Sequence, residues 1–186
     1  MDLVLGVFSA FGLSASAGLN AYIPLLVVAL LARFSGLITL NEPWNVLTSP
    51  WVIGLLVVLS LIEFFADKIP AVNHLNDLLQ TFVRPAAGAI VFAASAKIIT
   101  NVHPVLALGM GLLVAGGVHG VKSLAVRPAV TAATAGAGNI PVSIAEDILA
   151  AFLSIIAAVM PVLMAVILVV LGAWLASRLW SPQKAR

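Results

Sequence analysis

The sequence predicts an all-α polytopic transmembrane bundle of about five spans, with broken or re-entrant helices and one amphipathic helix. Three observations predict this class: 62% of the 186 residues are hydrophobic, 9% are charged, and the mean hydropathy is +1.18. Soluble domains are about 45–50% apolar and about 25% charged, and disordered chains combine low hydrophobicity with high charge, so both classes are excluded. We expect residues 1–186 to form a single integral membrane domain.

The charge and cysteine counts narrow the possible partners. Nine Lys and Arg are nearly balanced by seven Asp and Glu, which gives a net charge of +2 and argues against a nucleic-acid partner. The absence of Cys excludes thiolate metal sites and thiol nucleophiles, and no cofactor is predicted. The expected partners are the lipid bilayer and a small solute, ion or lipid headgroup. A homo-oligomer is also compatible with the sequence.

Long uncharged runs predict the spans, since a membrane helix needs about 20 apolar residues. In chain order the predicted spans are Leu3–Ala32, Trp51–Ile62 with its flanks, the shorter Pro85–Thr100, Pro104–Val121 and Ile148–Ser177. As a single helix, the first or the last would measure about 45 Å, well beyond the hydrocarbon thickness. We therefore predict breaks at Ala17–Asn20 with Pro24, and at Pro161, or else long tilted and kinked helices.

The two ends of the chain predict its orientation. The start carries Asp2 and no basic residue, which indicates a retained span rather than a cleaved signal peptide. The end carries Arg178, Lys184 and Arg186 beside two Trp, a pattern typical of a cytoplasmic membrane interface. We expect a multi-pass protein of the inner membrane, with the C-terminus in the cytoplasm.

The charged residues are concentrated in two windows, 63–84 and 122–147, which hold nine of the sixteen. Glu63 and Asp67 lie four residues apart and so on one helix face. Residues 69–83 predict an amphipathic helix, with a polar stripe of Asn73, Asp77, Gln80 and Arg84. This helix either lies flat at the membrane interface or turns its polar stripe toward an internal cavity.

A short motif occurs twice, as Val83-Arg84-Pro85-Ala86 and Val126-Arg127-Pro128-Ala129. Proline favours the first helical turn, so each Arg is expected at a helix start, where free N–H groups and a guanidinium together bind anions. This weak internal repeat covers 83–100 and 126–141. A second pattern, small residues followed by Asn and then Ile-Pro, occurs around Asn20 and again around Asn139. It indicates either helix breaks like those of transporters or close packing of helices.

The candidate site residues follow from these motifs. For substrate binding we predict Arg84, Arg127, Asn20, Tyr22 and Asn139. For proton or ion coupling we predict Glu63, Asp67, Asp77, His74, His119, Glu146 and Asp147, because charged groups at membrane depth are costly and His titrates near neutral pH. The last two acids have a structural alternative, which is to complement a helix dipole.

Four functions are compatible with these residues. The favoured one is a transporter or permease for a small anionic or zwitterionic solute, with proton coupling as an option. The alternatives are a lipid-phosphate flippase, a non-transporting structural or assembly protein with buried ion pairs, and a divalent-metal enzyme using Glu63, Asp67, His74 and Asp77. We predict no enzyme, since the sequence has neither HExxH nor GxSxG, and the metal question stays open.

Several strings resemble a known family. They include Ser16–Pro24, Glu63–Pro70, His74–Asp77, Arg84–Gly88 and Gly117–Lys122. Together they are similar to a bacterial membrane family called domain of unknown function 4126, over about Leu13–Leu153. The resemblance implies a small polytopic membrane protein and carries no activity.

Overall fold

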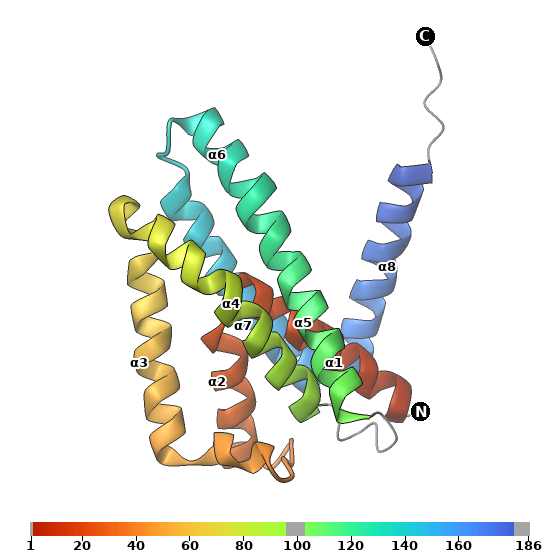
Figure 1. The fold of residues 1–186 in the computed structure, drawn as a ribbon. Helices are drawn as coiled ribbons and strands as arrows, with labels where there is room; N and C mark the ends of the chain where they lie inside the picture. Colours follow the sequence, from red (N-terminus) through yellow and green to blue (C-terminus); the bar gives the residue numbers. More distant parts are fainter. Residues whose placement is uncertain (1, 96–102, 181–186) are drawn as a thin grey trace.

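The computed structural model describes residues 2–95 and 103–180, and the side chains of 4–69, 75–95 and 103–178. This part of the chain is helical, with no strand. In order, its α-helices are α1 (Asp2–Leu19), α2 (Tyr22–Leu30), α3 (Pro50–Ala66), α4 (Pro70–Ser95), α5 (Pro104–Val121), α6 (Arg127–Thr134), α7 (Asn139–Val159) and α8 (Pro161–Trp180) (Figure 1).

Four helical stretches of the described chain are long and apolar enough to cross a membrane, by length and composition. They are Leu75–Ser95, Pro104–Thr134, Asn139–Val159 and Pro161–Arg178. The shorter apolar helices are Val4–Leu19, Tyr22–Ser35 and Pro50–Ala66. The predicted class, an all-α polytopic membrane protein, is confirmed, with four such stretches where about five spans were predicted.

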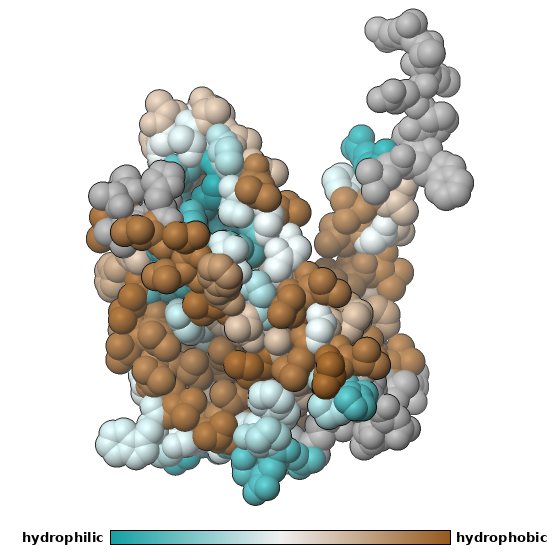
Figure 2. Space-filling model, in the orientation of Figure 1, coloured by the Kyte–Doolittle hydropathy of each residue, from teal (hydrophilic) through white to brown (hydrophobic). Residues whose placement is uncertain are grey.

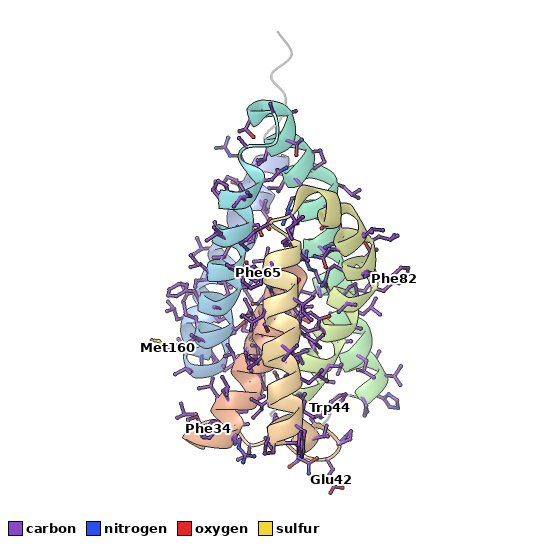
Figure 3. All side chains as sticks on the ribbon, turned by 90° about the vertical axis from the view of Figure 1, so that its left-hand side faces the viewer. Phe34, Glu42, Trp44, Phe65, Phe82 and Met160 are labelled. Atoms are coloured by element: carbon purple, nitrogen blue, oxygen red, sulfur yellow. The ribbon has the colours of Figure 1, made fainter. Side chains whose placement is uncertain are left out.

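The outer surface is apolar over a broad belt. Figure 2 shows this belt between polar atoms at the loop preceding α3 and polar atoms near the α6–α7 turn. Phe65, Phe82 and Met160 lie outermost in the belt, while Phe34, Trp44 and Glu42 lie toward the loop end (Figure 3). Phe82 is 74% exposed, which suits lipid rather than water.

Helix α4 carries the predicted amphipathic segment, and its polar side faces inward. Gln80 and Arg84 are buried, whereas Leu78, Leu79 and Phe82 are exposed. Of the two alternatives, the structure therefore has Gln80 and Arg84 of the polar stripe inside the protein, while the Asn73 side chain lies outside the described residues. An outward apolar face and an inward polar face reverse the arrangement of a water-soluble helix.

The first apolar run is broken at Asn20 and Ala21, between α1 and α2. Pro24 explains the position, because a proline has no N–H to offer the carbonyl four residues earlier, which is that of Asn20. The Asn20 side chain caps α2: its Oδ1 accepts the backbone N–H of Tyr22 at 3.1 Å and of Ile23 at 3.0 Å. The break predicted in this run is present.

The last apolar run is also divided. α7 ends at Val159 and α8 begins at Pro161, and Met160 between them has φ −128° and ψ 64°. The proline ring disfavours helical geometry at the residue before it, which places the break there. Figure 1 shows α8 turning away from α7 and standing apart from α3 and α4.

The expected helix starts at the two Arg-Pro motifs require correction. Arg84 and Pro85 lie inside α4, which continues through the proline. Arg127 is the first residue of α6, but it follows a π-helical turn, Lys122–Val126, and Val126 is already helical. Neither Arg stands beside free N–H groups. The π-helical turn leads directly into α6, so the chain stays helical through Arg127 and Pro128.

The core lies where α1, α4 and α5 pack together. Gly88 on α4 faces Gly111 on α5, and a Cβ on either glycine would meet backbone of the other helix. The Ser14 hydroxyl of α1 donates to the Gly88 carbonyl oxygen at 2.7 Å and lies 3.2 Å from that of Gly111. This close approach holds α1, α4 and α5 together.

Candidate functional site

Eight charged side chains form one network at the end of the bundle near the α6–α7 turn. Its carboxylates are Glu63, Asp67, Glu146 and Asp147, and its cations are Lys68, Arg84, Lys122 and Arg127. Each makes an ion pair of 2.8–3.7 Å with another member. This charge network therefore carries no net charge. The members come from α3 and the turn after it, α4, the α5–α6 region and α7.

Arg84 occupies the innermost position of the charge network and is 0% exposed. Its Nη2 and Nε donate to Glu63 Oε1 at 2.8 and 3.2 Å, and its Nη1 lies 3.0 Å from His119 Nδ1. A guanidinium only donates, so Nδ1 accepts and the hydrogen of a neutral His119 lies on Nε2. That Nε2 then donates to the Thr81 hydroxyl oxygen at 3.2 Å.

Asp67 is the carboxylate that the most cations share. Its Oδ2 lies 3.0 Å from Arg127, 3.6 Å from Arg84 and 3.7 Å from Lys122, and Oδ1 accepts from Asn76 at 2.6 Å. Burial raises the pKa of this carboxyl, but Lys122, Arg84 and Arg127 outweigh burial and hold it below its ordinary value. Asp67 therefore stays ionised at neutral pH.

Both arginines of the repeated motif reach this same carboxylate, although neither begins a free helix end. Arg127 Nη2 contacts Asp67 Oδ2 at 3.0 Å and Glu146 Oε2 at 2.9 Å. Arg84 and Arg127 thus form a clamp around this carboxylate. The partners of the clamp are acids of the protein itself.

Residues at the break between α1 and α2 form hydrogen bonds with members of the charge network. The Ala21 N–H donates to Glu63 Oε2 at 3.1 Å, and Lys122 Nζ donates to the Leu19 carbonyl oxygen at 2.9 Å. Asn20 Nδ2 donates to Asp147 Oδ1 at 3.0 Å. The carboxylate meets the positive start of α2, and the ammonium meets the negative end of α1.

A pocket of about 760 Å³ borders the charge network on the side of the α6–α7 turn. Figure 2 shows polar atoms in a hollow between α6 and α4. Its polar lining consists of Asp67, Lys68, Asp77, Ser123, Arg127, Thr131 and Asn139. Asp77 Oδ1 is buried and has no hydrogen-bond partner among the described residues. The pocket thus offers both signs of charge and one unsatisfied acceptor.

The predicted site residues fall into three groups. Most meet in the charge network or contact it directly: Arg84, Arg127, Glu63, Asp67, Glu146, Asp147, Asn20 and His119. Asp77 and Asn139 line the pocket instead, and the partly buried Tyr22 packs against the hydrophobic core. The His74 side chain lies outside the described residues. Within those residues no group of three or more His, Asp or Glu is arranged to hold a metal ion.

Sequence reasoning missed two network members, Lys68 and Lys122. Lys68 pairs with Asp147 at 3.1 Å, and Lys122 pairs with Glu146 at 2.9 Å. Both lie inside the charged windows, next to Asp67 and three residues after His119. The charge balance of the sequence could have revealed them. Four buried acids need four cations, and the two arginines supply only two.

The apolar helices and the buried charge network define a multi-pass membrane protein with a polar centre near one end of the bundle. The chain belongs to the family described as domain of unknown function (DUF4126), whose model matches residues 7–181. The family resemblance of the sequence motifs is thereby confirmed. Comparison with curated proteins and with solved structures gave no match.

Proposed function

We propose that this protein is a transporter that binds a small anionic or zwitterionic solute in the pocket bordered by Arg127. One observation carries the proposal: the pocket wall includes the ion pair of Asp67 and Arg127, so a solute can reach the buried charge network directly. Charged groups at membrane depth are expensive to bury and commonly mark a transport pathway.

The lining suggests how such a solute would be held. An anionic group would compete with Asp67 and Glu146 for Arg127, and Lys68 lies on the same pocket wall. A solute ammonium or a transferred proton would satisfy the free Oδ1 of Asp77. The anion replaces a carboxylate at the guanidinium, and the displaced carboxylate then becomes available to a proton.

Uptake by proteoliposomes tests the proposal with a panel of amino acids, small carboxylates and phosphate. Arg127→Gln should reduce uptake of the transported solute at least about tenfold, because a hydrogen bond to a charged group contributes about 1.5–3 kcal/mol. Arg127→Lys should retain part of the activity. Arg178→Gln is the matched control, since Arg178 is exposed, stacks on Trp174 and is not among the residues that line the pocket.

Asp77→Asn distinguishes an anionic from a zwitterionic solute. It disturbs no ion pair, because the Asp77 carboxyl makes no ion pair in the described structure. Uptake of a zwitterion should fall and uptake of an anion should not. A flip assay with a labelled lipid phosphate in the same vesicles tells a lipid headgroup from a free solute. Unchanged uptake in Arg127→Gln would refute the proposed binding group.

A second candidate, a non-transporting structural protein, is favoured by one observation. Every charged member of the charge network already has an ion-pair partner, an arrangement that can specify a fold with little net stabilisation. This candidate predicts that no solute of the panel shifts the thermal unfolding of the purified protein. A transporter predicts a saturable upward shift for its solute, which Arg127→Gln weakens.

A further inference from the structure

The break between α1 and α2 exposes backbone groups that a continuous helix would pair internally. In a continuous helix the Leu19 carbonyl would accept the N–H of Ile23, but that N–H donates to Asn20 Oδ1 instead. Lys122 Nζ takes its place and donates to the Leu19 oxygen at 2.9 Å. The carbonyl end of α1 is therefore met by a cation that arrives from another helix.

Lys122 is held at this point by oxygen atoms from three directions. Besides the Leu19 carbonyl, Glu146 Oε2 lies 2.9 Å and Asp67 Oδ2 lies 3.7 Å from its Nζ, and the residue is only 3% exposed. One backbone carbonyl at a helix break together with two carboxylates is a set of hard oxygen ligands suited to a small monovalent cation. We call these three groups the oxygen cage.

We propose that the oxygen cage is a monovalent-cation site that the Lys122 ammonium fills from within, as a cation tethered to the chain. Its consequence for transport rests on the proposed function: the carrier needs no alkali ion in the medium, because its own ammonium already occupies that place. The binding claim itself holds whether or not the protein transports a solute.

The oxygen cage lies among the other charged groups of the network. From every neighbouring element a charged or titratable group faces the cage: Glu63 and Asp67 from α3 and its end, Arg84 from α4, His119 from α5, Arg127 from α6, and Glu146 and Asp147 from α7. Arg84 is paired with Glu63 and lies against His119, while Arg127 contacts the same two cage oxygens as Lys122, Asp67 Oδ2 and Glu146 Oε2. Without Lys122 the cage would keep Arg127 on its two carboxylates and would lose the donor to the Leu19 carbonyl oxygen.

Chemical rescue of Lys122→Ala tests the proposal. The substitution removes three carbons and the ammonium, which propylammonium would replace. Thermal unfolding of the purified variant is compared in propylammonium, sodium and tetramethylammonium chloride at equal ionic strength. We expect a saturable rise of about 3–6 °C in Tm with propylammonium at ten times its Kd, and none with tetramethylammonium, which cannot donate a hydrogen bond.

Two variants make the rescue specific. Lys122→Met fills the same space without charge and should show no response to propylammonium. Lys122→Ala combined with Glu146→Gln keeps the network neutral but removes one cage carboxylate, so its rescue should be lost or weakened at least about tenfold in Kd. Should Lys122→Ala unfold in detergent, the monodisperse fraction recovered in propylammonium against tetramethylammonium gives the same comparison.

The outcomes distinguish this site from the transport proposal. Equal responses of Lys122→Ala to propylammonium and tetramethylammonium would overturn the oxygen cage and leave the uptake results untouched. Wild-type uptake that requires sodium would overturn the tethered-cation role while supporting transport. Wild-type stability and uptake that do not change when choline replaces sodium are the expected result.

Discussion

At the scale of single residues, Arg84 is the side chain most completely enclosed by the charge network. Replacing it with Gln leaves Glu63 as a buried carboxylate without its guanidinium, and Asp67 loses one of its three cations. Removing one partner of a buried pair costs about 3–5 kcal/mol. We therefore expect Arg84→Gln to lower the free energy of unfolding in detergent by about that amount.

A double-mutant cycle gives the control for this loss. Glu63→Gln combined with Arg84→Gln removes one charge of each sign, and a Gln oxygen can still accept the Ala21 N–H. The double variant should be more stable than Arg84→Gln alone. Arg33→Gln, at an exposed residue that donates to the Thr48 carbonyl, should change stability by no more than about 0.5 kcal/mol. Additive single effects would contradict the pairing.

Asp67 makes stability depend on acid pH. Since its pKa is lower in the folded protein than in the unfolded chain, its contribution is complete above the unfolded value of about 3.9 and is lost as the pH falls through the folded value. Wild-type Tm should therefore exceed that of Asp67→Asn at pH 6, and the gap should narrow below about pH 4. A gap that widens on acidification would contradict the ionised state.

The residues of the site were predictable only in part. Acids and arginines stand out in a chain with 9% charge, and the structure brings Glu63, Asp67, Arg84 and Arg127 into ion-pair contact. Lys122 was not recognised, because its role depends on a carbonyl that is freed 103 residues earlier in the chain. No local pattern encodes a contact between a helix break and a distant ammonium.

At the scale of elements, the crossing of α4 and α5 depends on two facing glycines. A Cβ on Gly111 would lie 2.7 Å from Ala89 Cα, a backbone atom that cannot rotate away. We expect Gly111→Ala to cost about 1–3 kcal/mol by overpacking. Gly109→Ala on the same helix is the matched control: its Cβ would meet nothing within 4 Å, and alanine favours helix. Similar Tm values for the two variants would contradict the close approach.

Prolines show what a sequence tells about elements and what it leaves open. Pro24 and Pro161 lie at predicted breaks, and the structure has breaks there. Pro85 lies within α4 and leaves it continuous, although the same rule predicted a helix start. A proline removes one hydrogen bond, and whether the helix then separates depends on what satisfies the freed groups. At Asn20 a side-chain cap and the charge network do so, and neither is visible in the local sequence.

At the scale of the whole molecule, the α6–α7 turn, which lines the pocket, lies at one end of the bundle and the loop preceding α3 lies at the other (Figure 1). The end of α8 that carries Arg178 is on the side of the pocket. Basic residues beside a span favour the cytoplasm, and the sequence continues with Lys184 and Arg186. We therefore predict that the pocket opens to the cytoplasm and that the loop containing Asn45 faces the outside.

Because the chain has no cysteine, single-cysteine labelling can test this orientation without background. Asn45→Cys lies in the exposed loop and Ala137→Cys in the exposed α6–α7 turn beside the pocket. The experiment uses intact cells whose outer membrane has been made permeable. A maleimide that cannot cross the inner membrane should label the Asn45→Cys variant at once, and the Ala137→Cys variant only after the inner membrane is disrupted. The reverse pattern would place the pocket outside, so that the charge network would be reached by solutes from the medium. Labelling of both variants in intact cells would contradict a bundle that separates its two ends across a membrane.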